Sequence, residues 1–148
     1  MSLRNLMSME KREAVSLRPY NTFGIDATAA AMYDCHDEAE LRAAIMASAE
    51  GRRYVLGGGS NVLFLGDFDG TIIRPLMGGV EVVSEAGDCV TVRAGAGVAW
   101  DDFVAWCVTR GLYGVENLSG VPGSVGAAPV QNIGAYGVEA KDVIDSVE

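Results

Sequence analysis

Three consecutive glycines, Gly57, Gly58 and Gly59, precede Ser60 and Asn61 in the stretch YVLGGGSNVLF. Glycine lacks a Cβ atom, so such a loop can bring backbone N–H groups against a phosphate that a side chain would hold away. A tight turn explains the same letters, and for this motif alone the turn is the better interpretation, because short Gly motifs match by chance. The stretch is neither a P-loop, which needs Gly-Lys-Ser/Thr, nor a G-x-G-x-x-G fingerprint that opens a helix.

A second glycine-rich stretch, LYGVENLSGVPGSVGAAPVQNIGAYG, occupies residues 112–137 and carries almost no charge. Within it Pro122 and Gly123 favour a turn, Ser124 could cap a helix, and Gly126 and Ala127 allow close approach. Backbone of this composition is expected to pack closely against the core or a ligand. Two separated loops that suit anions fit a long ligand, and a dinucleotide with a central pyrophosphate is one, with each loop holding one part of it.

Three motifs carry a resemblance to a known family. YNTFGID at residues 20–26, LGGGSNVLF at 56–64 and ENLSGVPGSVGAAPVQNIGAYG at 116–137 resemble the FAD-binding domain of UDP-N-acetylenolpyruvoylglucosamine reductase, in the family's order and spacing. The resemblance implies an α+β domain in which two small subdomains hold FAD. This is the vanillyl-alcohol-oxidase (PCMH) type of flavin domain, which is not a Rossmann fold.

The resemblance also implies cofactor contacts in three segments: a first flavin loop, a second flavin loop, and a segment that runs past the flavin ring toward the substrate. Ala127 and Ala128 stand where many relatives have Gly or Ser, which is a mild departure. Asn21 and Thr22 match the family too, but their polar side chains could equally form a turn. The implied cofactor-binding residues are Gly57, Gly58, Gly59, Ser60 and Asn61; Val121, Pro122, Gly123, Ser124, Gly126 and Ala127; and Gln131, Asn132, Ile133, Gly134 and Tyr136.

The family uses NADPH to reduce FAD and then reduces the enolpyruvyl ether of UDP-N-acetylglucosamine to UDP-N-acetylmuramate for peptidoglycan. This implies roles in cell-wall biogenesis, cell shape and cell division. The reaction needs a group that stabilises charge and a proton donor. In the family these lie in a Tyr-Arg-x-Ser motif and later segments that this sequence lacks, so we predict no catalytic residue here and little or no turnover. The alternatives are a non-catalytic nucleotide- or flavin-binding module and another PCMH-type flavin oxidoreductase.

The elements that must position these loops follow from apolar periodicity. We expect strands over residues 29–35, over RYVL as a short buried strand, and over NVLFL, GTIIRPL, GVEVVSE and CVTVRAGAG. KDVIDSVE is expected to be the first half of a further strand. A first helix begins after the cap Asp37 with Glu40 three residues on, and Gly51 is expected to stop it. Its inner face is predicted to hold Leu41, Ala44, Ile45 and Ser48.

A second helix is predicted within VAWDDFVAWCVTRG, and Gly111 follows its end. Trp100, Phe103, Val104 and Cys107 form its inner face, so we interpret Trp100 and Trp106 as packing residues. AGAGVAW before this helix is interpreted as a turn. Tyr136, an aromatic hydroxyl in a small apolar loop, is expected to contact a ligand, whereas His36 is expected to be a surface residue.

Composition limits the partners. The 148-residue chain has eleven basic and twenty acidic residues, so its net charge is −9. This charge disfavours nucleic acid and anionic membranes as binding partners, but it does not disfavour a small anionic ligand. Cys35, Cys89 and Cys107 are odd in number and far apart, so neither disulfides nor a metal site is expected. With no signal-peptide core and no membrane-length apolar run, we expect a cytoplasmic protein. The resemblance implies that the partner of the full-length enzyme is a UDP-sugar.

The expected domain organisation has two parts. Residues 1–19 are interpreted as a lead-in, and its start, Met1–Met9 with three methionines, as partly an added sequence. Residues 20–148 are interpreted as an FAD-binding domain that is truncated before a substrate-binding domain.

Overall fold

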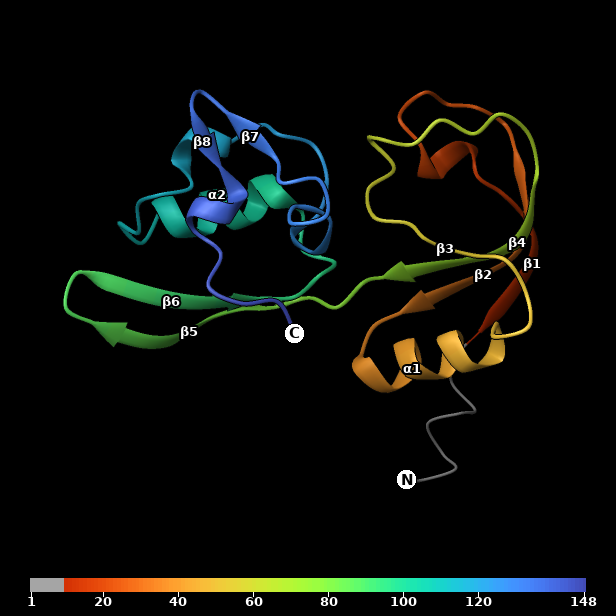
Figure 1. The fold of residues 1–148 in the computed structure, drawn as a ribbon, viewed down its shortest axis with the longest axis horizontal. Coiled ribbons are helices and arrows are strands. Elements are labelled where there is room, and N and C mark those ends of the chain that lie inside the picture. Colours follow the sequence, from red (N-terminus) through yellow and green to blue (C-terminus); the bar gives the residue numbers. More distant parts are fainter. Residues whose placement is uncertain (1–9) are drawn as a thin grey trace. The chain divides into compact units, whose positions relative to one another are not determined.

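A computed structural model describes residues 10–148, so the interpretation of Met1–Met9 lies outside the described residues. The chain forms two compact units: the first ends at Met77 and the second runs from Gly78 to Glu148. Figure 1 shows that each unit has its own strands and its own α-helix.

The first unit is built on a four-stranded sheet in the order β1-β2-β4-β3. Its strands are β1 (Lys11–Ser16), β2 (Thr28–Cys35), β3 (Arg53–Val55) and β4 (Phe68–Pro75). β4 is parallel to both β2 and β3, whereas β1 is antiparallel to β2. The sheet therefore includes residues 11–16 of the segment that we expected to be a lead-in.

Alternating side chains give this sheet two different faces. Tyr33, Cys35 and Ile73 pack against the helix α1 (Glu38–Ala47). Met32 and Ile72 point to the opposite face, where they are covered by the loops around residues 17–27 and 56–64. Because both faces are buried, β2 reads as a nearly continuous apolar run. The first glycine-rich loop belongs to the face opposite α1.

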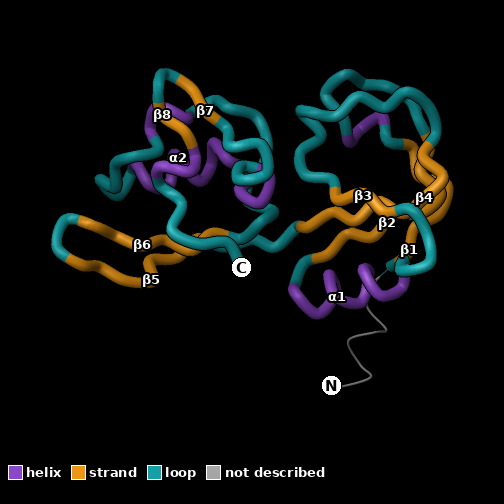
Figure 2. The backbone as a smooth tube through the Cα atoms, in the orientation of Figure 1, coloured by secondary structure: helices purple, strands orange, loops and turns teal. Residues whose placement is uncertain are grey.

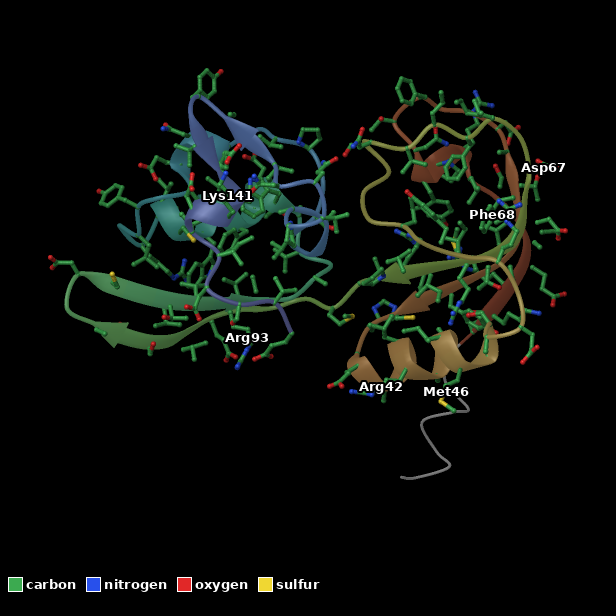
Figure 3. All side chains as sticks on the ribbon, in the orientation of Figure 1. Arg42, Met46, Asp67, Phe68, Arg93 and Lys141 are labelled. Atoms are coloured by element: carbon green, nitrogen blue, oxygen red, sulfur yellow. The ribbon has the colours of Figure 1, made fainter. Side chains whose placement is uncertain are left out.

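The start of α1 is as predicted, but its end is not. The Asp37 carboxylate accepts a hydrogen bond of 2.8 Å from the backbone N–H of Glu40. The helix ends at Ala47, and the Ser48 hydroxyl donates to the Ala44 carbonyl at 2.6 Å, so Gly51 lies beyond the end and does not stop it. Leu41, Ala44 and Ser48 face inward as predicted, whereas Ile45 is exposed. Figure 3 shows Arg42 and Met46 on the solvent side of this helix.

Two strand predictions in the first unit are wrong. β3 was expected to be buried, but Tyr54 and Val55 are 42% and 58% exposed because β3 is at the edge of the sheet. The NVLFL run forms a loop and no strand. Val62 and Phe64 pack on the core, while Leu65 is 93% exposed. The run keeps the alternation of a strand, but it crosses the face of the sheet, where no strand edge offers hydrogen bonds.

The second unit combines a two-stranded ribbon, a helix and a small hairpin, as the colours of Figure 2 show. The ribbon is β5 (Val80–Ala86) with β6 (Cys89–Ala94), the helix is α2 (Trp100–Val108), and the hairpin is β7 (Gly134–Ala135) with β8 (Val138–Glu139). The runs GTIIRPL, GVEVVSE and CVTVRAGAG thus form β4, β5 and β6 as predicted. α2 ends at Val108, and Gly111 follows its end as predicted, with a φ of +70° and an N–H that donates to the Val108 carbonyl.

The core of the second unit lies under α2. Its inner face is the predicted one, with Trp100, Val104 and Cys107 buried and Phe103 half-buried. The Trp100 indole N–H donates to the Leu118 carbonyl at 2.9 Å, and Trp106 packs against the same cluster, which confirms the packing role predicted for both tryptophans. Leu118, Ala128, Ile133 and Ala140 complete this core.

The predicted strand over KDVIDSVE is wrong. The chain instead makes a short 3-10 helix, Ala140–Asp142, and continues without regular structure. The Glu139 and Asp142 side chains form a capping box that closes this turn, so the local hydrogen bonds favour a helical start.

Candidate functional site

The first glycine-rich loop begins directly after β3. Leu56 anchors it, because its side chain is buried and its N–H donates to the Ile73 carbonyl at 2.9 Å. Among the hydrogen bonds of the described residues, none has the N–H of Gly57, Gly58 or Gly59 as its donor. Gly58 is exposed and Gly57 half-buried. Gly59 is buried, so of these three undonated amides those of Gly57 and Gly58 are the more accessible to an anion, as the phosphate interpretation requires.

Gly59 fixes this loop against the YNTFGID turn. Its φ is +68°, and a Cβ atom placed on it would lie 2.0 Å from the carbonyl oxygen of Tyr20. Its own carbonyl accepts a hydrogen bond of 3.2 Å from the N–H of Thr22. Only glycine fits this backbone position without a shift of the turn. Two motifs that are far apart in the sequence therefore form one structure.

Asn21 organises that turn from inside. Its amide nitrogen donates to the carbonyls of Leu17 and Ile25 at 2.8 and 3.0 Å, and its Oδ1 accepts from the N–H of Ile25 at 3.0 Å. The residue is 7% exposed. Of the two readings left open for Asn21, the structure therefore favours the turn, since its polar atoms are used within the first unit.

The second glycine-rich segment pairs with the AGAGVAW stretch. Val125 and Gly126 donate to the carbonyls of Val98 and Ala96 at 2.9 and 3.0 Å, and Trp100 donates to the carbonyl of Gly123 at 3.0 Å. AGAGVAW is thus a turn that leads into α2, as predicted, and it also holds the second segment in place.

This pairing divides the amides of the second segment into two groups. The N–H groups of Val125, Gly126 and Ala127 are used internally, the last by the Ser124 carbonyl at 3.0 Å. Within residues 10–148, the N–H groups of Gly123 and Ser124 donate no hydrogen bond. Ser124 does precede a 3-10 helix, Val125–Ala127, but its hydroxyl makes no capping bond, so the predicted side-chain cap is wrong.

The third segment is divided between core and surface. Ile133 is 8% exposed and packs under α2. Asn132 has a φ of +47° and accepts a hydrogen bond of 2.9 Å from the N–H of Lys141. Tyr136, at the tip of the β7–β8 hairpin, has a φ of +52° and is 89% exposed. Its ring is accessible to a ligand, and the ligand contact expected for Tyr136 stays a prediction.

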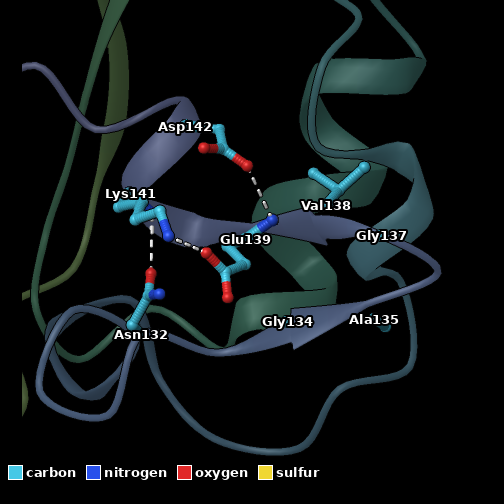
Figure 4. A pocket seen from close by; sticks show the side chains of 8 residues that line it. All are labelled: Asn132, Gly134, Ala135, Gly137, Val138, Glu139, Lys141 and Asp142. Atoms are coloured by element: carbon cyan, nitrogen blue, oxygen red, sulfur yellow. Dashed lines mark hydrogen bonds and ion pairs between the residues drawn. The ribbon is translucent and has the colours of Figure 1, made fainter.

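An open pocket of about 530 Å³ lies beside this hairpin and includes Asn132 and Gly134 (Figure 4). Lys141 and Glu139 form an ion pair at its wall. The Lys141 ammonium, with a further bond from Asn132, lowers the pKa of the Glu139 carboxyl, and Glu139 raises the pKa of Lys141. The Asn132 and Asp142 side chains also accept backbone hydrogen bonds, from Lys141 and Glu139, so the polar groups of this wall are largely paired with one another. The remaining lining residues are Ala135, Gly137, Val138 and Asp142.

The other reactive side chains are not arranged for catalysis. Burial raises the pKa of the Cys35 thiol to about 11 and also raises that of Cys107, so neither is a ready nucleophile. His36 is exposed as predicted. Within residues 10–148 no group of three or more His, Cys, Asp or Glu side chains could hold a metal ion. No helix of that range has the length and apolar character to cross a membrane.

Comparison with known proteins agrees with this geometry. A family model described as "FAD binding domain" matches residues 29–148. A UDP-N-acetylenolpyruvoylglucosamine reductase of Pseudomonas aeruginosa is 52% identical over 143 residues, which cover 95% of this chain and 42% of that protein. The enzyme of the same name from Bacteroides fragilis is 56% identical over 134 residues, covering 90% and 40%. The chain thus spans about two fifths of the length of these relatives.

A solved structure is similar as well. The crystal structure of UDP-N-acetylenolpyruvylglucosamine reductase from Thermus caldophilus matches with a TM-score of 0.66 and 28% identity, covering 88% of this chain and 44% of that one. The fold and the loops define an α+β flavin domain of the vanillyl-alcohol-oxidase (PCMH) type, with FAD as its cofactor. The chain belongs to the FAD binding domain family. The predicted resemblance to the N-terminal part of UDP-N-acetylenolpyruvoylglucosamine reductases is confirmed.

Proposed function

We propose that this chain is the FAD-binding part of an NADPH-dependent reductase that converts UDP-N-acetylglucosamine enolpyruvate to UDP-N-acetylmuramate in peptidoglycan synthesis. The names of the relatives support the reaction and the UDP-sugar substrate. The observation that carries FAD binding is the run of three undonated amides at Gly57, Gly58 and Gly59. Such an enzyme would act in the cytoplasm, and cell shape and division would depend on it.

The residues fit FAD at its charged centre. Backbone N–H groups bind a pyrophosphate whatever the net charge of the surface, and the absence of Cβ atoms allows close approach. In the second segment the amides of Gly123 and Ser124 can play the same part, whereas Gly126 and Ala127 support the loop. We therefore propose two groups of FAD-binding residues. The residues nearer the pyrophosphate are Gly57, Gly58, Gly59, Ser60, Asn61, Val121, Pro122, Gly123, Ser124, Gly126 and Ala127. The residues nearer the flavin ring are Gln131, Asn132, Ile133, Gly134 and Tyr136.

The role of this chain is to bind and orient the cofactor. FAD, when bound, supplies a ring that accepts hydride from NADPH and passes it to the substrate. We assign no catalytic residue here. Arg93 is paired with Glu81 and Glu148, and Arg110 lies over the Trp106 ring at 4.0 Å, so neither is placed beside the 131–137 segment by any contact in the described residues.

We propose that the FAD-binding domain comprises residues 20–148 together with β1, since Lys11–Ser16 extend the sheet that carries the first loop. Residues before β1 would be lead-in. The substrate-binding part would come from sequence that the longer relatives have in addition.

The test is a titration of the purified chain with FAD, followed by flavin absorbance and fluorescence. We expect stoichiometric binding in the wild type and loss of affinity by at least about tenfold in Gly59→Ala, or ~1.4 kcal/mol. Gly87→Ala is the matched control, because Gly87 has a φ of +60° but no atom within 4 Å of an added Cβ. A wild-type chain that binds no FAD, or equal losses in both variants, would contradict the proposal.

A further inference from the structure

A cluster of charged side chains in the first unit contacts the turn that supports Gly59. The Asp34 carboxylate of β2 accepts from Arg12 of β1 at 2.6 Å and from Arg74 of β4 at 2.9 Å. A second nitrogen of Arg12 donates to the Tyr20 hydroxyl at 3.0 Å. The ion-paired side chains are 19–32% exposed. Three neighbouring strands thus hold one aromatic side chain of the turn.

The Tyr20 ring is held by stacking as well as by its hydroxyl. The Arg74 guanidinium carbon lies 4.4 Å from the ring centroid, and that of Arg12 lies 5.8 Å from it. In the described part of the chain the Arg74 Nε is buried without a hydrogen-bond partner. A buried donor that lacks a partner is costly. Arg74 thus stacks on the Tyr20 ring, while its Nε is left without a hydrogen bond.

The backbone of Tyr20 continues this support to the glycine loop. Its carbonyl oxygen occupies the space where a Cβ of Gly59 would be, and the N–H of Thr22 donates to the Gly59 carbonyl. A shift of Tyr20 would disturb the first contact, and the Thr22 contact belongs to the same turn, so the side-chain contacts of Tyr20 bear on the position of Gly59. The Asn21 side chain closes the same turn with three hydrogen bonds to the backbone of Leu17 and Ile25.

We propose that Tyr20 is a positioning residue for FAD: Arg12 and Arg74 fix its ring, and its backbone holds Gly59 and with it the loop whose amides would bind an anion. This rests on the function proposed above. Preorganised donors bind more tightly because less order is lost on binding. Two guanidinium groups against one carboxylate also leave this cluster with a net positive charge, which favours an anion on this unit although the chain carries −9.

The test compares variants of Tyr20 with a variant that destabilises the same unit from its other face. Tyr20→Leu removes the stacking and the hydroxyl, whereas Tyr20→Phe keeps the ring. Asp37→Ala removes the cap of α1, which packs on the opposite face of the sheet. We measure the melting temperature without FAD, the dissociation constant of FAD, and ¹⁵N relaxation of the Gly57, Gly58 and Gly59 amides in the FAD-free chain.

We expect Tyr20→Leu to weaken FAD binding by about tenfold or more relative to an Asp37→Ala variant of similar melting temperature, and to increase the mobility of the three amides. Tyr20→Phe should restore most of both properties. Equal loss of affinity in Tyr20→Leu and Asp37→Ala, or unchanged amide mobility in Tyr20→Leu, would overturn the proposal. A wild-type chain without FAD affinity would refute the proposed function instead, and the relaxation data would still decide whether Tyr20 orders the loop.

Discussion

The backbone of Gly126 lies directly on Ala96: its N–H donates to the Ala96 carbonyl at 3.0 Å, and a Cβ placed on it would lie 2.6 Å from the Ala96 Cβ. Together with the bridge between Ala99 and Ser124, this contact makes the stretch around residues 94–100 the packing partner of the second glycine-rich segment. The amides that could contact a ligand there are consequently those of Gly123 and Ser124.

The Gly126→Ala substitution should therefore destabilise the second unit. The added methyl group overpacks the contact with Ala96, which typically costs about 1–3 kcal/mol. Urea unfolding of the FAD-free chain, followed by tryptophan fluorescence, measures the change because Trp100 lies in this core. Gly78→Ala is the control, since no atom lies within 4 Å of its added Cβ. Equal stabilities of the two variants would contradict this packing.

Valine at Gly58 should impair FAD binding more than folding. Gly58 is exposed, so we expect the FAD-free protein to accommodate the branched side chain, which would hold an anion away from the amides. We expect the dissociation constant to rise by about tenfold or more, or ~1.4 kcal/mol, with little change in melting temperature. Gly66→Val, in the same unit and with open space around its Cβ, should leave both unchanged.

The same comparison at Gly123 should give a mixed result. Its φ of +132° is one that a β-branched residue rarely adopts, so Gly123→Val is expected to lose stability as well as FAD affinity. Calorimetry of the FAD-free chain and a flavin titration separate the two losses. A loss of FAD affinity in Gly123→Val no larger than its loss of stability accounts for would point to a structural turn without ligand contact.

The stability of the second unit should fall at acidic pH in part through Asp101. The N–H of Gly120 and the hydroxyl of Ser119 both donate to its carboxylate at 2.7 Å and lower its pKa. A lowered folded-state pKa means that this stabilisation is complete above the ordinary aspartate value of about 3.9 and is lost as the pH falls through the lower folded value. Urea unfolding between neutral and acidic pH should show a shallower decline in Asp101→Asn. An identical pH profile in both proteins would refute this assignment.

The isolated chain should not convert the enolpyruvyl substrate to UDP-N-acetylmuramate, even with FAD and NADPH supplied. Charge stabilisation and a positioned proton donor each contribute on the order of a hundredfold or more, and we assign neither to this chain. Slow reduction of FAD by NADPH can persist, because it needs fewer positioned groups. Product formation is measured chromatographically and flavin bleaching by absorbance. Turnover near that of an intact reductase would show that catalytic groups are present here.

Local patterns determined much of this protein. The apolar run of β2, the Asp37 cap and the inner face of α2 were predictable because each depends on neighbours within a few residues. The motifs at 20–26, 56–64 and 116–137 were also sufficient to indicate the family and its cofactor. The same local rules were wrong for β3 and for NVLFL, since an apolar run does not reveal whether it will lie in the middle of a sheet, at its edge or across its face.

Only the tertiary structure decided which glycine does what. The letters of GGGSN do not distinguish Gly59, which fits against Tyr20, from Gly57 and Gly58, whose amides are left for a ligand. They do not show that the amide of Gly126 is used by Ala96 either. These assignments depend on pairs of residues that are 30 or more positions apart, 59 with 20 and 126 with 96. Such pairs meet only when the sheet and the turns place them, because close packing and hydrogen bonding act over a few ångströms of space and not along the chain.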